Sequence, residues 1–235
     1  MMRKWILLFI ISTLLSCESS SEQPVVYHSG ALRTMMSGDI SKTIDLDTVA
    51  QKKHLYALGA FEGLLGEVQI FDGVSYSSRV KDSVVTLETG IAGATSLLVY
   101  TQVEQWIKNS SFQFTSKTDL ERLLWNEAKK IGLDTEKPFP FVLEGKVSEL
   151  QWHVINWNPK DTIHTHQKHQ ESGLNGIIKN KNIRIVGFYS QKHKAIFTHH
   201  SSNIHMHFVA EDQNLAGHVD DLTIEGSITL KLPKR

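Results

Sequence analysis

The alternation of apolar and polar residues predicts a chain built mainly of β-strands. An apolar run from Val68 to Phe71 leads through Asp72-Gly73 into Val74 to Tyr76, which is the chemistry of a tight hairpin turn. A few helices are expected between the strands, so the predicted fold class is strand-dominated α/β. The other stretches typical of strands are Leu55 to Phe61, Ala94 to Val103, Phe139 to Ile155, Ile183 to Tyr189, Ile204 to Ala210 and Val219 to Leu232.

Helical spacing is clearest in one segment, from about Thr118 to Ile131. Thr118 with Glu121 is typical of a capping box, and Gly132 stands where a left-handed residue favours the end of a helix. A short amphipathic helix is expected within Ala31 to Ser37. The apolar stripe of the long helix comprises Leu120, Leu123, Leu124, Ala128 and Ile131.

The sequence offers few candidate loops or boundaries between subdomains. The polar stretch from Asn156 to Asn182 is expected to be a long loop or insertion. Lys137-Pro138 is a candidate boundary between two subdomains, near residue 137. The sequence contains no internal repeat and no long low-complexity stretch.

The composition of the 235 residues excludes some kinds of site and disfavours one class of function. Lys and Arg number 25, as do Asp and Glu, a balance that disfavours a nucleic-acid binder that gains affinity by neutralising phosphates. Cys17 is the sole cysteine, so disulfides and cysteine-based zinc sites within one chain are excluded. Histidine occurs 12 times, and any metal chemistry must therefore rest on histidines and carboxylates.

The N-terminus has the features of a secretory signal. Arg3-Lys4 precedes an apolar run from Trp5 to Leu15, which is shorter than the roughly 20 residues that cross a bilayer. The run ends in Leu14-Leu15-Ser16-Cys17, which resembles a bacterial lipobox; a plain signal peptide that contains a cysteine is the alternative. We expect a signal peptide at 1–16, a lipidated tether at 17–24, and an exported lipoprotein anchored in the inner or outer membrane.

Removal of the signal changes the charge balance. Residues 1–16 hold two of the 25 basic residues and none of the 25 acidic ones, so the mature chain would carry a net charge of −2. Acyl chains on Cys17, rather than a basic surface, would then hold the domain at the membrane.

His205 and His207 form an H-x-H pair within a predicted strand. Because alternate residues of a strand share a face, both imidazoles project to the same side. His218 comes within reach if the chain folds back as an antiparallel neighbour after the turn at 212–217. Three histidines leave an open position on a zinc ion, as in catalytic zinc sites. Two partly exposed strand histidines are the alternative.

The other histidines carry weaker expectations. His164, His166 and His169 lie in polar surroundings and are expected in a solvated loop, with an adventitious or regulatory metal as the alternative. His199 and His200 precede the predicted ligand strand, and both a place in the same cavity and a place in a loop stay open. No functional role is expected of three further histidines: His28, His54 and His193.

Glu67 has the most unusual setting of the carboxylates. It lies in an apolar segment between Leu64 and Phe71, where a carboxylate is uncommon unless it is paired or functional. Desolvation would raise its pKa and suit it to proton transfer. An outward-facing residue at the start of a strand is the alternative.

The order of these motifs resembles the α-acetolactate decarboxylase family. The family's metal motif is H-x-H-F, then acidic residues, then G-H-V, and His205, His207 and His218 fill its three ligand positions. The resemblance covers roughly Val25 to Leu230, which implies one such domain over residues 25–235. The motifs that carry it are Tyr27-His28-Ser29, Ala57 to Glu67, Phe71-Asp72-Gly73, Val186 to Tyr189, His205 to Phe208 and Gly217 to Asp220.

The resemblance implies a mixed β-sheet with helices and a smaller β-barrel-like part that bears the metal. It also implies the zinc-dependent conversion of 2-acetolactate (2-hydroxy-2-methyl-3-oxobutanoate) to acetoin and CO2. Zinc on the hydroxyl and keto oxygens of the substrate would stabilise the enediolate that loss of CO2 leaves. By motif position, Glu67 takes the place of the family's active-site glutamate, as the acid that protonates the carbon.

Two positions depart from the family pattern. The place of the family's active-site arginine falls near His153, whose imidazole can hydrogen-bond a carboxylate but lacks the fixed charge and fork of arginine. His153 therefore replaces the arginine or marks a changed substrate. The family usually has a further C-terminal segment with another active-site glutamate, and the sequence given ends at Arg235.

Three functions stay open. The first is a zinc-dependent decarboxylase of acetolactate or of another 2-hydroxy-3-oxo acid. The others are a non-catalytic metal-binding lipoprotein on the same scaffold and a lipid-tethered binding protein for a small extracellular ligand. The expected partners are a small-molecule acid and a membrane, with no nucleic acid, and unpaired strand edges allow a homodimer.

Overall fold

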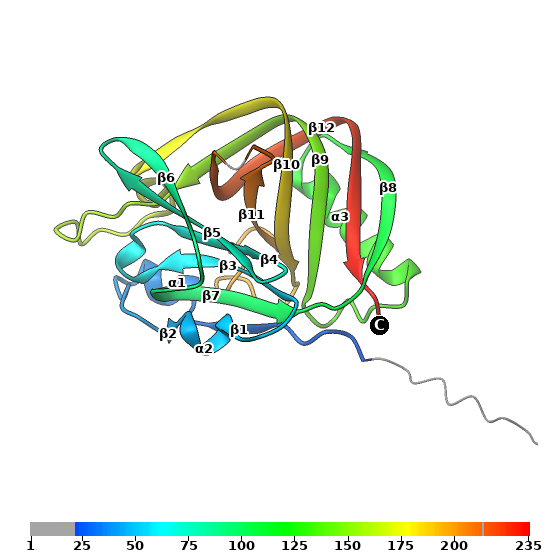
Figure 1. Ribbon diagram of the computed structural model, residues 1–235, viewed down its shortest axis with the longest axis horizontal. Coiled ribbons are helices and arrows are strands. Elements are labelled where there is room, and N and C mark those ends of the chain that lie inside the picture. Colours follow the sequence, from blue (N-terminus) through cyan, green and yellow to red (C-terminus); the bar gives the residue numbers. More distant parts are fainter. Residues whose placement is uncertain (1–21, 213) are drawn as a thin grey trace, which may run out of the picture.

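The computed structural model describes residues 22–212 and 214–235, which form two antiparallel β-sheets with a few helices packed around them (Figure 1). The first sheet has the order β1-β7-β3-β4-β5-β6, with β2 paired to β7. Its strands are β1 (Tyr27–Ser29), β2 (Ile44–Asp45), β3 (Leu55–Phe61), β4 (Glu67–Phe71), β5 (Val74–Lys81), β6 (Val84–Thr89) and β7 (Ala94–Gln102).

The second sheet has the order β11-β10-β9-β12-β8, and β11 also pairs with the start of β12. The pairing path β11-β10-β9-β12 therefore returns to its first strand. The strands are β8 (Trp106–Phe114), β9 (Phe139–Val154), β10 (Leu174–Tyr189), β11 (Ile204–Ala210) and β12 (Ala216–Pro233).

The helices are short except for one. They are α1 (Leu32–Met36), α2 (Asp47–Ala50), α3 (Lys117–Lys130) and α4 (His166–Glu171), with a 3-10 turn η1 (Glu62–Leu64) before β4. Among the described helices, none combines the length and the apolar content that a membrane span requires.

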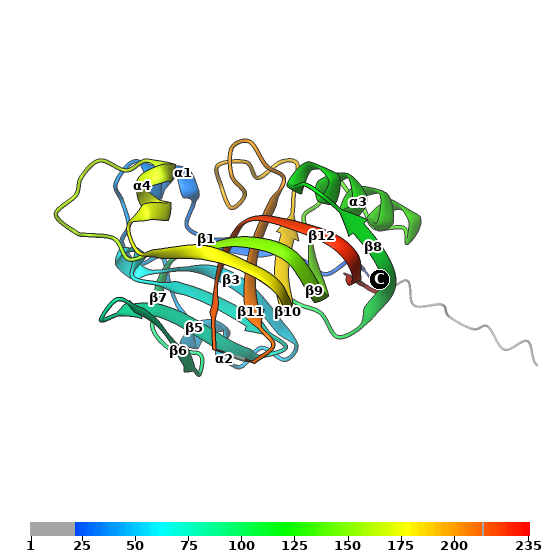
Figure 2. The same cartoon turned by 90° about the horizontal axis from the view of Figure 1, so that it is seen from above.

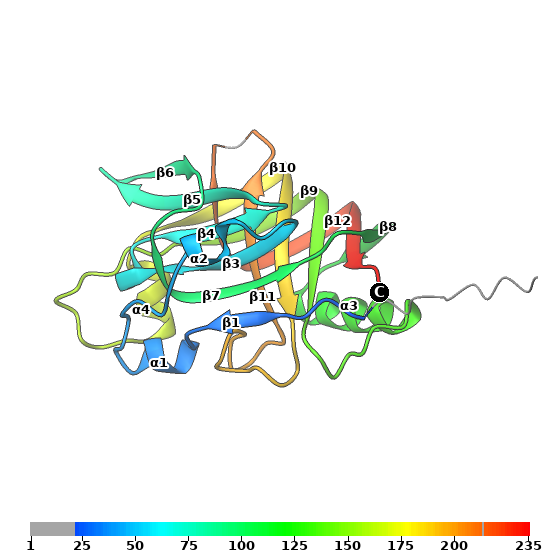
Figure 3. The same ribbon diagram turned by 60° about the horizontal axis from the view of Figure 1, so that its bottom comes forward.

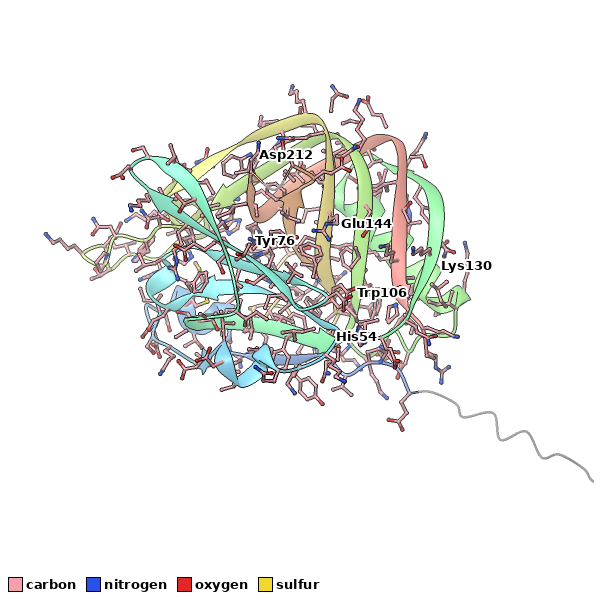
Figure 4. All side chains as sticks on the ribbon, in the orientation of Figure 1. His54, Tyr76, Trp106, Lys130, Glu144 and Asp212 are labelled. Atoms are coloured by element: carbon pink, nitrogen blue, oxygen red, sulfur yellow. The ribbon has the colours of Figure 1, made fainter. Side chains whose placement is uncertain are left out.

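The two sheets share a core. Leu58 and Leu97 of the first sheet pack in one apolar cluster with Val186 and Phe188 of the second. A polar contact crosses between the sheets as well, because the Arg184 guanidinium donates to the Tyr76 hydroxyl at 2.9 Å. Figure 4 labels Tyr76, which belongs to β5. This packing sets residues of β4 against residues of β11, which the site requires.

Helix α3 forms where the spacing predicts it, but it begins at Lys117, one residue before the expected start. Ser116, not Thr118, is the N-cap, and its hydroxyl accepts a hydrogen bond from the Asp119 amide at 3.1 Å. Leu120, Leu124 and Ala128 are buried against the second sheet, as the apolar stripe indicates. Gly132 follows the helix with a φ of +80°, which confirms the expected end.

The predicted strands are confirmed, and the hairpin turn is too. Phe71 pairs with Val74 across Asp72-Gly73, whose φ angles of +50° and +80° are those that the Asp-Gly pair favours. The expectation of a long loop or insertion from Asn156 to Asn182 holds for residues 158–165 and is wrong for the rest, which contains α4 and the first half of β10. The polar residues of this part of β10 lie on strand faces open to solvent.

The strand-dominated α/β class is confirmed. Pairings between the named strands are all antiparallel, a detail in which the described sheets differ from the mixed sheet that the resemblance implied.

Candidate metal centre

Three adjacent strands bring a row of histidines together. His207 of β11 lies directly opposite His218 of β12, and His218 lies directly opposite His153 of β9. Directly paired residues of a sheet project from the same face, so the three imidazoles share one side. His205 joins them from two residues earlier on β11, on the face that strand alternation predicts.

The close approach of β12 to β9 depends on a glycine. A Cβ atom at Gly217 would lie 2.6 Å from the main-chain oxygen of His153. Gly217 thus lets the start of β12 pass close to β9, and its neighbour His218 is positioned by that approach.

The nitrogens of three of these imidazoles converge. His205 Nε2 lies 3.3 Å from His207 Nε2, and His218 Nδ1 lies 3.4 Å from His207 Nε2. His205 Nδ1 donates to the Phe197 carbonyl oxygen at 2.8 Å, and His207 Nδ1 lies 3.2 Å from Gln69 Oε1. With both Nδ1 atoms protonated, the two Nε2 atoms present lone pairs to each other.

Facing lone pairs at 3.3 Å repel unless a proton or a cation lies between them. Burial also keeps these imidazoles neutral: it lowers the pKa of His205 to about 3 and those of His207 and His218 well below the ordinary value. Neutral imidazole is the form that binds a metal. The three side chains therefore fit a metal ion, which their nitrogen atoms are close enough to hold.

Glu67 faces this cluster from the other sheet. It is 4% exposed, and its Oε2 lies 3.8 Å from His207 Nε2. Burial raises its pKa well above the ordinary value, and a hydrogen bond from the Ile155 amide acts weakly in the opposite direction. The alternative of an outward-facing carboxylate at a strand start is wrong, because β4 packs this face against β11.

His153 is held by a carboxylate. Its Nδ1 lies 2.9 Å from both carboxylate oxygens of Asp220, and its Nε2 lies 3.9 Å from Glu67 Oε1. Asp220 also accepts a hydrogen bond from Gln170 Nε2 at 2.6 Å. Burial raises the pKa of Asp220, but the donors His153 and Gln170 outweigh it, so the net shift is downward. The carboxylate thus fixes Nδ1–H on His153 and turns Nε2 toward Glu67.

A second group of ligand atoms overlaps the first. His153, His218 and Asp220 also offer one atom each within reach of a single ion. The Asp220 carboxylate already accepts hydrogen bonds from His153 and Gln170. The Nε2 atoms of His205 and His207, in contrast, face each other as two lone pairs, and neither donates a hydrogen to the other. The trio His205, His207 and His218 is therefore the better metal site.

A cavity of about 350 Å³ opens beside the histidine row. Besides strands of both sheets, four further segments line it: α1, the first turn of α3, α4, and the segment between β10 and β11. Figures 2 and 3 show these segments along one side of the molecule. Its floor holds Glu67, His153, His205 and His218, and its apolar wall includes Met35 and Leu97.

The prediction of a solvated loop is correct for His164, which lies in a loop, and wrong for His166 and His169, which belong to α4 and line the cavity. His166 is exposed, whereas His169 is only 7% exposed. His169 Nε2 lies 2.9 Å from His164 Nδ1, and the His164 ring stacks on Trp157. Burial lowers the pKa of His169 to about 4.

Of the remaining histidines, one lines the cavity and the others lie elsewhere. Of the pair whose place was open, His199 lines the cavity and His200 is exposed beside it. His28 of β1 contacts His193 of the segment between β10 and β11. His54, labelled in Figure 4, pairs with Asp72 at an exposed turn. Cys17 lies outside the described residues.

Sequence reasoning missed three polar residues of the site. Gln69 lies two residues from Glu67 on the same strand, and this alternation could have placed it on the same face. Asp220 follows His218 by two residues in β12, and the same rule applies. Lys117 reaches the cavity from α3, and no local pattern indicates that.

Residues 26–234 match the protein family described as alpha-acetolactate decarboxylase. No curated protein matches the chain. Among solved structures, a protein of unknown function from Staphylococcus aureus, described as similar to alpha-acetolactate decarboxylase, is 18% identical. The similarity covers 88% of this chain and 85% of that chain, with a TM-score of 0.69.

Two Bacillus subtilis structures are similar to the same extent. The alpha-acetolactate decarboxylase of strain 168 is 20% identical over 88% of this chain and 85% of that chain, with a TM-score of 0.69. The acetolactate decarboxylase of subspecies spizizenii is 19% identical over 89% and 86%, with a TM-score of 0.71. At these identities the likeness shows a shared fold.

Proposed function

The chain belongs to the alpha-acetolactate decarboxylase family, and from that premise we propose that it decarboxylates 2-acetolactate to acetoin and CO2 with a zinc ion. The observation that carries the proposal is the convergence of three neutral imidazoles, two buried and one half-buried, and one buried carboxyl on a single small cavity. A cavity of about 350 Å³ suits a small acid.

The metal would be held by His205, His207 and His218, whose converging nitrogens leave further coordination positions to the cavity. Bound zinc supplies a Lewis acid that stabilises negative charge on oxygen. Gln69 and the Phe197 carbonyl oxygen hold the outer nitrogens of two of these rings and so orient them.

Glu67 is the proposed proton donor. Its raised pKa keeps the carboxyl protonated at a pH where an ordinary glutamate is ionised. It faces the same space as His153 Nε2 and His207 Nε2, at 3.9 and 3.8 Å. The carboxyl can therefore deliver its proton to the carbon that has lost CO2, while the apolar wall excludes water.

His153 is proposed to hydrogen-bond the substrate through Nε2. Asp220 fixes the ring, so that the nitrogen facing the cavity is set in place before the substrate arrives. Because this imidazole stands where the family pattern has arginine, a related 2-hydroxy-3-oxo acid is the second candidate substrate. A non-catalytic metal-binding role on the same scaffold is the third candidate.

The test combines metal analysis with an acetolactate assay. The zinc-loaded protein is expected to form acetoin above the spontaneous background, and His205→Ala is expected to lose both metal and activity. His54→Ala, at an exposed turn outside the residues that line the cavity, is the matched control and should lose neither. Stoichiometric zinc without turnover of acetolactate or a related acid would support the non-catalytic role and overturn the proposal.

A second part of the proposal concerns where in the cell the protein is located. We propose that the protein is exported and held at a membrane by acyl chains on Cys17. The support is the order of the basic start, the short apolar run and the sole cysteine at its end.

A further inference from the structure

Lys117 brings an unexplained positive charge to the cavity. It is the first residue of α3, and among the described residues that line the cavity it is the one lysine or arginine. The Ser116 cap fixes the start of the helix and therefore the direction in which the Lys117 side chain leaves it.

The ammonium group of Lys117 has no ion pair within the described structure. Its Nζ donates a hydrogen bond to the main-chain oxygen of Asp220 at 3.1 Å, which is a neutral acceptor. Burial lowers the pKa of Lys117, as expected for a cation moved out of water. Lys117 is half-buried, and a cation held partly out of water is stabilised when an anion accompanies it.

Three carboxylates act on Lys117 electrostatically, namely Asp220, Asp221 and Glu121, and none of them forms an ion pair with it. Asp221 accepts a hydrogen bond from the Leu222 amide at 2.9 Å. Glu121 accepts from the Ser202 hydroxyl, the Asn203 amide and the Asn203 side chain, and so ties α3 to the segment before β11. The Asp220 carboxylate accepts from His153 and Gln170. The charge of Lys117 is therefore available to an anion that enters the cavity.

Asp220 also links Lys117 to the metal side of the cavity. Its main-chain oxygen accepts from Lys117, and its carboxylate accepts from His153, whose ring lies 4.7 Å from that of His218. One residue of β12 thus sets an ammonium group and an imidazole beside the candidate metal ligands. Together they offer a charge and a directional hydrogen bond, which is what a carboxylate needs.

We propose that Lys117 binds the carboxylate group of a 2-hydroxy acid in this cavity, next to His153. The proposal rests on the decarboxylase function proposed above and names the residue that recognises the charge of its substrate. Lys117 is a binding residue in this proposal, and it takes no part in moving the proton.

The test compares Lys117→Met with Lys117→Arg. The methionine keeps the length and removes the charge, whereas the arginine keeps the charge. Lys129→Met is the matched control, because Lys129 lies on the same helix over the Trp125 ring and away from the cavity. Circular dichroism and zinc content check that each variant folds.

The expected result is a KM for acetolactate that rises about tenfold to a hundredfold in Lys117→Met, the loss of one charged hydrogen bond, with a smaller change in kcat. Lys117→Arg should restore most of the affinity, and Lys129→Met should match the unaltered protein. A KM within twofold of the unaltered protein in Lys117→Met would overturn the proposal.

Equilibrium binding gives a second readout that needs no turnover. The probes are 2-hydroxy-2-methylpropanoate and its uncharged methyl ester. Lys117→Met should weaken binding of the acid by the same factor and leave the ester unchanged. Binding of the acid that depends on Lys117, without acetoin formation, would support this inference while the proposed reaction fails. Absence of acid binding to the unaltered protein would overturn the inference.

Discussion

At the scale of single residues, the site is defined by what burial does to charge. Burial of Glu67 favours its neutral, protonated form, whereas burial of His205 favours the neutral, unprotonated form. One environment thus yields a proton donor and a metal ligand from residues that lie a few ångströms apart. Burial likewise lowers the pKa of Lys117, whose ammonium group forms no ion pair among the described residues.

Glu67→Gln tests the proton donor. The amide has nearly the same shape but no acidic proton, so kcat should fall about a hundredfold to ten-thousandfold while zinc content is unchanged. In the unaltered protein kcat should decline as pH rises through the raised pKa of Glu67, because the carboxyl then loses its proton. Steady-state kinetics from pH 5 to 9 measure both effects. Activity within threefold of the unaltered protein would exclude Glu67 as the donor.

The buried histidines make the stability of the metal-free protein depend on pH. The pKa of His205 falls from 6.5 to about 3, so the unfolded chain binds more protons between these values. Stability should therefore be full above pH 6.5 and be lost progressively as pH falls toward 3. Urea unfolding in a chelator at pH 7.5 and 5 measures this. His205→Asn should show a weaker pH dependence, and His54→Asn the same dependence as the unaltered protein.

At the scale of elements, register and capping place the site residues. Pairing of β11, β12 and β9 sets His207, His218 and His153 in one row, and a one-residue slip would turn His218 to the opposite face. The cap of α3 decides where Lys117 and Glu121 meet the cavity. Helix periodicity predicted the body of α3, but the cap differs because Thr115, Ser116 and Thr118 are all plausible N-caps.

Ser116→Ala tests the cap of α3. Loss of the hydroxyl that accepts from the Asp119 amide should lower the free energy of unfolding by about 1 kcal/mol. Thr118→Ala is the control, since Thr118 is exposed and does not cap the helix. Urea unfolding measures both variants. A larger loss in Thr118→Ala than in Ser116→Ala would contradict the assignment.

At the scale of the whole molecule, the site exists because two sheets pack face to face. β4 of the first sheet brings Glu67 and Gln69 to the histidines of β11 and β12 in the second. α1, α3, α4 and the segment before β11 then close the sides of the cavity. The anchor proposed for the chain is separate from this architecture, because it depends on residues before the folded domain.

Cys17→Ser tests the anchor. Without the thiol, acylation cannot occur, and the protein should leave the membrane fraction as a soluble or unprocessed form. Fractionation of cells, with mass measurement of the N-terminus, follows the outcome. A variant that is fully cleaved and still sediments with membranes would show that the anchor is not the lipid.

Features that depend on neighbours along the chain were predictable from the sequence. Strand alternation placed His205 and His207 on one face, an Asp-Gly pair predicted the turn before β5, and the spacing to His218 was right for an antiparallel neighbour. The tertiary structure decided that Glu67 faces inward, that α4 walls the cavity with His166 and His169, and that Lys117 lies within it. The physical reason is that exposure and pKa depend on what packs against a side chain, and those contacts join residues far apart in the chain.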